Sequence, residues 1–149
     1  MHRRLGVVIG LGALLLPHAA PGRDGADRPA IVADLERRFP GRFLFTTSGD
    51  GVFAVYQRVE RPADIGADQD PVCLLGACYV PVDTVPGDVL RRAGTDPAHA
   101  DGVRRSFKAG QDAYERALRA PAPEREAAQG LWRAHLVGIG RCLRDRSAC

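Results

Sequence analysis

Apolar residues recur at helical spacing in three stretches of the chain. The first stretch, residues 29–39, opens on a proline at its first turn, which is typical of a short amphipathic helix. The second stretch begins after Asp96, a favourable N-cap residue, and continues to Ala120. The third follows the proline-rich break at residues 121–123 and continues to Leu143. Because this break is short, we expect the last two helices to pack as an antiparallel pair.

A different pattern marks two strands. Residues 42–47 and 52–59 are rich in β-branched and aromatic side chains, and the link between them contains two glycines. This arrangement predicts a β-hairpin. Residues 78–85 also resemble a strand, but Pro81 has no amide hydrogen to donate, so we expect an edge strand or an extended segment. A short helix is predicted to start at Pro86.

Together these patterns predict an α+β fold. The β-hairpin, with or without a third edge strand, would pack on the C-terminal antiparallel helix pair, since an isolated hairpin is only marginally stable in water.

The first twenty residues have the three parts of a secretory signal. Arg3 and Arg4 precede an uninterrupted apolar run at residues 5–16, and small residues follow at positions 19 and 20. The run is too short to span a bilayer. We therefore expect a signal peptide at 1–20, a flexible lead-in at 21–28 and a single small domain at 29–149. An uncleaved amphipathic anchor or a buried helix is the alternative.

The distribution of charge along the chain is more informative than the net charge. The chain has 21 Lys and Arg against 18 Asp and Glu, but residues 23–88 carry a net charge of −4 and residues 89–149 one of +5. This asymmetry either steers an anionic partner or lets the two halves attract each other. Nucleic acid is a less favoured partner, because the aromatic residues of the helix predicted between Asp96 and Ala120, Phe107 and Tyr114, lie on its apolar stripe rather than among its cations. A hydrophobic content of 45% disfavours a disordered chain.

Four cysteines in a chain that we expect to be exported indicate two disulfides. Three pairings are open. The short spacings favour Cys73 with Cys78 and Cys142 with Cys149, since Gly76 lets the chain turn back between the first two. A crossed pairing would instead join the middle loop to the C-terminal helix.

Two other uses of the cysteines are less favoured. A redox site would use Cys73 and Cys78, but their spacing is C-x4-C and their neighbours are apolar, so nothing nearby would lower a thiol pKa. A zinc site would combine cysteines with His99 or His135, but the paired ligand spacings of zinc sites are missing from the sequence. We therefore predict no metal and no cofactor.

His135 is the best single candidate for chemistry. It falls on the apolar stripe of the last helix between Trp132 and Ile139, where a histidine could act as an acid, a base or a ligand. No sequence pattern supplies its partner, so a hydrogen-bonded histidine between two helices is the favoured interpretation.

Three carboxylates, Asp64, Asp68 and Asp70, are a weaker candidate for binding calcium. They lie in one loop and could offer oxygen ligands, but their spacing does not match an EF-hand. A solvated acidic loop is the favoured interpretation.

The sequence therefore favours an exported, disulfide-bonded, non-catalytic binding or interaction protein of the cell envelope or exterior. Its partner would be an unknown protein or an anionic component of the envelope. One alternative is a small secreted enzyme in which His135 meets Asp50, Asp64 or Asp70 in a cleft. A thiol-redox protein that uses Cys73 and Cys78 is a third and weaker alternative.

Overall fold

The computed structural model describes residues 28–149, so the expected signal peptide and all but the last residue of the expected lead-in lie outside the described residues. Strands and helices follow one another along the chain in this order: α1 (Ala30–Arg38), β1 (Phe43–Thr47), β2 (Val52–Val59), the 3-10 helix η2 (Pro62–Asp64), β3 (Val72–Leu74), β4 (Ala77–Pro86), α2 (Gly87–Thr95), α3 (Pro97–Arg119), α4 (Ala122–Arg144) and the 3-10 helix η3 (Arg146–Ala148).

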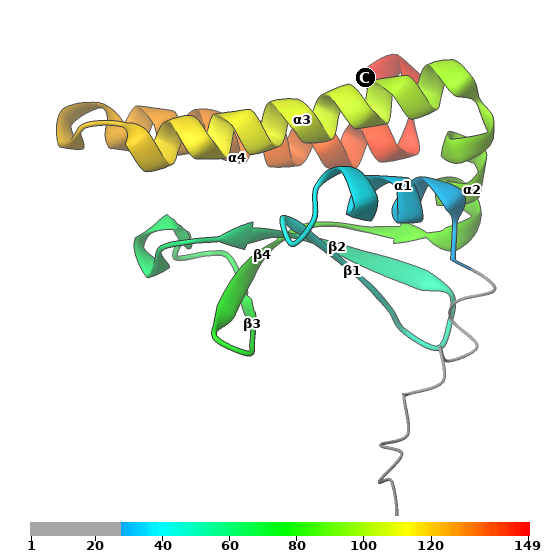
Figure 1. Cartoon of the computed structure of the whole chain (residues 1–149), viewed down its shortest axis with the longest axis horizontal. Coiled ribbons are helices and arrows are strands. Elements are labelled where there is room, and N and C mark those ends of the chain that lie inside the picture. Colours follow the sequence, from blue (N-terminus) through cyan, green and yellow to red (C-terminus); the bar gives the residue numbers. More distant parts are fainter. Residues whose placement is uncertain (1–27) are drawn as a thin grey trace, which may run out of the picture.

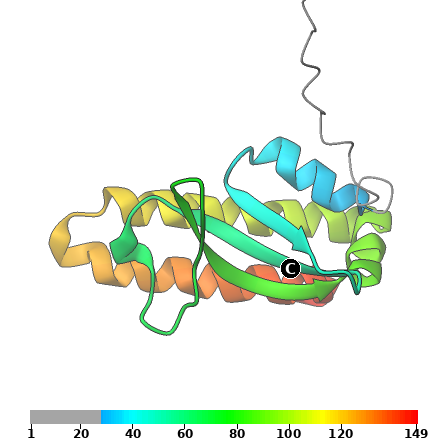
Figure 2. The same cartoon turned by 90° about the horizontal axis from the view of Figure 1, so that it is seen from below.

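The four strands form one antiparallel sheet in the order β1-β2-β4-β3. The helices lie on one side of this sheet, and its other face is left uncovered by them (Figures 1 and 2). The long helices α3 and α4 run side by side across the sheet, while α1 lies near its β1 edge. The fold is thus α+β, as the sequence predicts.

Strand β4 combines a central and an edge segment. Its residues 77–79 pair with β3, and the last two of them pair with β2 as well, whereas from Val80 onward its partner in the described sheet is β2 alone, so Pro81 lies on an edge segment, as the sequence predicts. Its register shifts where Val55 pairs with Asp83 and Tyr56 pairs with Pro81, which leaves Val82 as an extra residue. A bulge interrupts the hydrogen-bond ladder locally, so a residue without an amide hydrogen fits beside it on this edge segment.

Aromatic side chains fill the space between the hairpin and the helices. Burial alternates strictly along β2, and the buried residues face the helix layer. The Phe107 ring on α3 lies 4.7 Å from the Phe43 ring and 6.0 Å from the Phe45 ring, measured between centroids. Packed aromatic rings add to the stability gained from burying their apolar surface. This cluster fixes α3 over the β1–β2 hairpin.

The two long helices approach closely at Gly110. A Cβ atom built there would lie only 2.7 Å from Ile139 Cδ1 on α4, so a larger residue would require that methyl group to move. Further along, the rings of Tyr114 and Trp132 are 4.7 Å apart and buried. The expected antiparallel pair is therefore present, and Leu131 of α4 is 66% exposed.

Both disulfides connect cysteines that are close in sequence. Cys73 pairs with Cys78 across β3 and β4, and Cys142 pairs with Cys149 at the end of the chain. The second bridge folds the C-terminal segment back onto α4 and brings Cys149 against Gly102 of α3, where a Cβ atom would have no room. None of the helices within residues 28–149 is long and apolar enough to cross a membrane.

Candidate functional site

A groove of about 530 Å³ lies where the end of α1 meets the middle of α3. A second hollow of about 400 Å³ continues from it and shares four of its residues, Arg38, Phe39, Lys108 and Asp112. The complete lining of the first groove is Arg38, Phe39, Arg104, Arg105, Lys108, Ala109 and Asp112. The lining therefore combines four cations, the carboxylate of Asp112 and an apolar floor.

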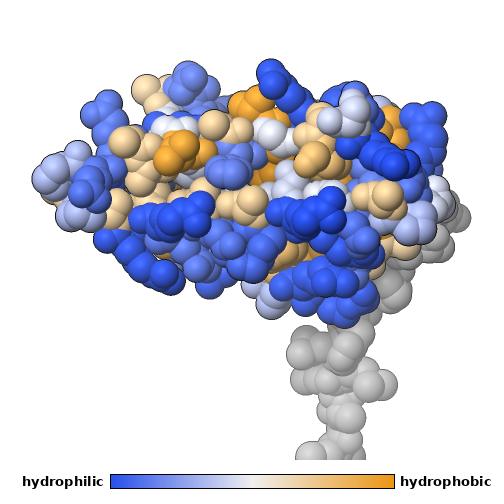
Figure 3. Space-filling model, turned by 90° about the horizontal axis from the view of Figure 1, so that it is seen from above, coloured by the Kyte–Doolittle hydropathy of each residue, from blue (hydrophilic) through white to orange (hydrophobic). Residues whose placement is uncertain are grey.

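Helix geometry explains why the cations gather here. Side chains three and four positions apart share a helix face, so Arg104, Arg105 and Lys108 all border the groove from α3. Arg37 and Arg38 lie in the last turn of α1, where the helix dipole favours positive charge. Figure 3 shows this helix side of the molecule, on which hydrophilic side chains surround scattered hydrophobic ones.

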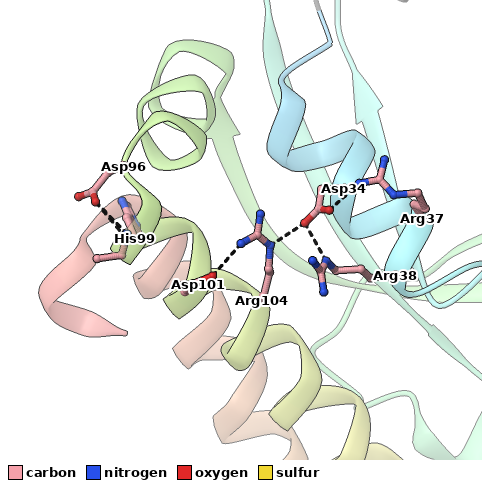
Figure 4. A network of polar contacts seen from close by, with 8 residues as sticks. Asp34, Arg37, Arg38, Asp96, His99, Asp101 and Arg104 are labelled. Atoms are coloured by element: carbon pink, nitrogen blue, oxygen red, sulfur yellow. Dashed lines mark hydrogen bonds and ion pairs between the residues drawn. The ribbon is translucent and has the colours of Figure 1, made fainter.

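Asp34 is the centre of a network of ion pairs behind the groove (Figure 4). Its Oδ1 atom accepts a hydrogen bond from Arg37 Nη2 over 2.7 Å. Its Oδ2 atom accepts from Arg38 Nε over 3.0 Å and from Arg104 Nε over 2.7 Å. The last bond joins α1 to α3, and Arg104 Nη1 also donates to Asp101 over 2.7 Å. One largely buried carboxylate thus orders three guanidinium groups.

The same contacts set the protonation of this network. Burial alone would raise the pKa of Asp34, but the hydrogen bonds and charges of Arg104 and Arg38 outweigh it and hold the pKa below its ordinary value. The hydrogen bond to Asp34 raises the pKa of Arg104. Asp34 is therefore an anion, and the arginines around it remain cations.

Several donors of this network stay available on the groove side. Arg38 and Arg104 both use Nε to hold Asp34, and among residues 28–149 neither Nη atom of Arg38 has a hydrogen-bond partner. Arg105 is exposed and forms no hydrogen bond or ion pair within the same part of the chain. Guanidinium groups held in this way match the oxygen atoms of a phosphate, sulfate or carboxylate.

The floor of the groove is anchored in the core. The Phe39 ring is half-buried and packs edge-on against Phe43 at 5.7 Å between centroids. A chain of buried amides leads to the wall of the second hollow: Trp132 Nε1 donates to Gln57 Oε1 over 2.8 Å, and Gln57 Nε2 donates to Gln111 Oε1 over 3.2 Å. These bonds connect the groove wall to both the sheet and α4, which holds its shape.

His135 lies between α3 and α4, as the sequence predicted. It is half-buried, and it lines a hollow of about 210 Å³ together with Ser106 of α3. Within residues 28–149 it forms no hydrogen bond or ion pair, so the expected interhelical hydrogen bond is not found there. The buried stripe of α4 includes Trp132 and Leu136, and His135 lies at the margin of this stripe.

The carboxylates proposed as partners of His135 lie elsewhere. Asp50 accepts hydrogen bonds from Ser48 and from the amide of Val52, which stabilise the β1–β2 turn. None of Asp50, Asp64 and Asp70 lines the hollow beside His135. The structure therefore does not assemble the histidine-centred cleft that the sequence suggested as an alternative.

Asp64 also corrects the calcium interpretation. It is fully buried, where it accepts hydrogen bonds from Arg61, from the Tyr114 hydroxyl over 2.9 Å and from Gln129 over 2.8 Å. Asp68 and Asp70 are exposed on the loop. No group of three potential metal-ligating side chains is found in residues 28–149, because the deep position of Asp64 separates it from the other two.

Sequence reasoning missed three of the polar residues that matter most in the structure. Asp34, Gln57 and Gln111 are not among the candidate residues that the sequence indicated. The alternation along β2 could have indicated that Gln57 is buried, because Gln57 lies on the same face of the strand as the buried residues Val55 and Val59. A polar residue on a buried face needs a hydrogen-bond partner, and Trp132 supplies it.

Comparisons of this chain with protein-family models, with curated proteins and with solved structures found no match in any of the three. The structure shows an α+β fold with two disulfides. All four cysteines are disulfide-bonded, which leaves no cysteine thiolate in residues 28–149 for the zinc site considered from the sequence. The disulfides are consistent with an exported protein.

Proposed function

We propose that this chain is an exported, non-catalytic binding protein that holds an anionic group in the groove between α1 and α3. The observation that carries the proposal is the arrangement around Asp34. That carboxylate binds Arg38 and Arg104 through their Nε atoms, and the Nη atoms of Arg38 are left for a ligand. Ordering these side chains before binding lowers the entropic cost of holding an anion.

The charge around the groove supports an anionic ligand. Arg105 adds a cation without a partner among the described residues, and Lys108 adds one that is shared only with Asp112 at the surface. The half-buried Phe39 gives the ligand an apolar surface beside the charges. An anionic lipid headgroup or a phosphorylated or sulfated polymer of the cell envelope has this combination of oxyanions and apolar parts.

Further observations support export of the chain and a single domain. An oxidising compartment preserves both disulfides, and the first twenty residues have the pattern of a secretory signal. Val82 packs against both hydrophobic clusters, one around Phe107 and one around Trp132, which supports a single domain for residues 29–149.

The test uses inorganic tripolyphosphate as the probe, titrated into the protein by calorimetry at low ionic strength. Arg105→Gln is the main variant, because this side chain supports no internal contact and its loss leaves the fold intact. We expect its affinity to fall about tenfold or more, since each charge-assisted hydrogen bond contributes at least that much. Added salt should weaken wild-type binding.

Arg125→Gln is the matched control, because Arg125 is an exposed cation at the start of α4, away from the groove. It should bind tripolyphosphate as the wild type does. Equal losses in both variants would mean that only net charge matters and would contradict the proposal, as would a wild-type protein that does not bind. Repeating the titration with vesicles of phosphatidylglycerol and phosphatidylcholine distinguishes a lipid headgroup from a free polyanion.

A further inference from the structure

The hairpin between β3 and β4 presents two leucines to solvent. Leu74 is 52% exposed and Leu75 is fully exposed, at 107%. Figure 1 shows this hairpin projecting from the sheet on the side opposite the helices. Soluble proteins rarely place neighbouring large apolar side chains at such a tip without a binding role.

The backbone at the tip makes this choice of residue more unusual. Leu75 has a φ of +51° and Gly76 one of +80°, and they form a two-residue turn between the paired residues Leu74 and Ala77. Turns of this kind favour Asn-Gly, because asparagine tolerates a positive φ. A leucine is unfavourable there, and its side chain gains no burial in return. Backbone strain of this kind is found mainly at functional sites.

A covalent bond holds the tip in this conformation. Cys73 and Cys78 are directly opposite each other in the strand register and are joined by a disulfide. They form the next pair after Leu74 and Ala77, which close the turn. The bridge closes a small loop and fixes the register of a hairpin that has only three residues in β3. The leucines are therefore presented in one orientation before any partner is met, which reduces the entropic cost of binding.

The charge of the surrounding chain indicates the kind of partner. Residues 62–90 contain five aspartates and no lysine, arginine or histidine. Asp64 is buried on Arg61, and Asp83 is paired with Arg144, but Asp68 and Asp70 are exposed just before β3. An apolar tip beside unpaired acids is repelled by an anionic membrane surface and attracted by cations on a protein.

The open face of the sheet continues from the tip. Val72, Tyr79 and Arg58 are neighbours across three strands, and all are partly exposed. Tyrosine and arginine are enriched in the energetically important parts of protein interfaces. These three residues would form the rim of an interface whose centre is Leu74 and Leu75.

We propose that residues 72–78 are a docking hairpin that inserts Leu74 and Leu75 into an apolar pocket, bordered by basic residues, on a partner protein. This surface is separate from the groove between α1 and α3, so the inference does not depend on the anion-binding function.

The first experiment places a photoreactive amino acid at position 75 in the cells that produce the protein. The expected result is a covalent adduct with one discrete protein, which is then identified and purified. Its affinity for the purified wild-type protein is measured directly, together with the affinities of two variants. Leu75→Asn removes the apolar side chain but suits the turn, so the hairpin should be at least as stable as before. Leu131→Asn is the control, since Leu131 is a similarly exposed leucine on α4.

We expect Leu75→Asn to weaken binding about 30-fold or more, as for an interface hot spot, and Leu131→Asn to bind as the wild type does. Replacing both Asp68 and Asp70 with asparagine should slow association and reduce its dependence on salt.

The proposal is overturned by the absence of any adduct, by an adduct only with a second copy of this chain, or by unchanged affinity in Leu75→Asn. It is also overturned if wild-type protein binds vesicles of phosphatidylglycerol and phosphatidylcholine and Leu75→Asn does not, because the tip would then insert into lipid.

Discussion

The Tyr114 hydroxyl donates a hydrogen bond to Asp64 Oδ2 over 2.9 Å and accepts one from the Glu60 amide over 2.5 Å. These two bonds fasten the loop that follows β2 to helix α3. Burial raises the pKa of the tyrosine hydroxyl, so the group stays protonated and remains the donor to Asp64.

We therefore predict that Tyr114→Phe lowers the free energy of unfolding by about 1–3 kcal/mol, the usual cost of leaving a buried polar group without its partner. Urea denaturation measures the change. Tyr79→Phe is the control, because Tyr79 lies on the open face of the sheet. A loss of equal size in both variants would show that the hydroxyl of Tyr114 has no special role.

Asp64 should make stability depend on pH. Burial raises its pKa, but hydrogen bonds from Arg61, Gln129 and Tyr114 outweigh this effect and leave it below the ordinary value of 3.8. A carboxylate whose pKa is lower in the folded state stabilises the protein above its unfolded pKa, and this contribution disappears as the pH falls through the folded value.

The free energy of unfolding of the wild type should thus decrease below about pH 4. Asp64→Asn should be less stable at neutral pH and should show a shallower decrease on acidification. Asp68→Asn, which changes an exposed aspartate of the same loop, should retain the wild-type profile. Parallel profiles for the wild type and Asp64→Asn in urea titrations would contradict this prediction.

Gly110→Ala should destabilise the helix pair by about 0.5–2 kcal/mol, because the added Cβ atom meets Ile139 Cδ1 at 2.7 Å and the cost of overpacking exceeds the gain in helix propensity. Ile139→Val removes that methyl group, so the double variant should recover part of the loss. Gly138→Ala, at a helical position with nothing within 4 Å, should instead raise stability by about 0.5–1 kcal/mol. Thermal unfolding by circular dichroism distinguishes these outcomes. If all three variants shift the melting temperature alike, helix propensity rather than close packing controls this position.

The two disulfides should differ in their structural importance. Cys142 is buried in the core at 1% exposure, whereas Cys73 is exposed on the projecting hairpin. Replacing Cys142 and Cys149 together with alanine should lower the free energy of unfolding by about 2–3 kcal/mol from loop closure alone, with a further loss from packing. The corresponding change at Cys73 and Cys78 should cost less. Denaturant unfolding of both double variants measures the two losses in free energy of unfolding. A larger loss for the Cys73 and Cys78 variant would contradict this prediction.

Much of the backbone could be predicted from the order of residue types. The start of α3 is an example: Asp96 accepts hydrogen bonds from the amides of Ala98 and His99, as its N-cap position suggests. The start of strand β4 could not be placed in the same way. Pro81 correctly indicated an edge segment, but nothing in the sequence showed that residues 77–79 also pair with β3 or that a bulge lies at Val82.

The candidate site was less predictable than the fold. Its cations are visible in the sequence as charges on one helix face, but Asp34 lies 70 residues before Arg104 and nothing local connects them. His135 shows the opposite difficulty, since its spacing on α4 suggested burial, yet it lies at the margin of the buried stripe and is half-buried.

The sequence by itself determined the elements that depend on near neighbours: the helices and their caps, the first hairpin, the short cysteine spacings and the unequal charge of the two halves. Only the tertiary structure decided which residues work together. It placed Asp34 between arginines of two helices and set Leu75 in a strained, exposed turn above a disulfide. The physical reason is that caps and turns depend on residues a few positions apart, whereas buried ion pairs and exposed tips depend on how distant elements pack.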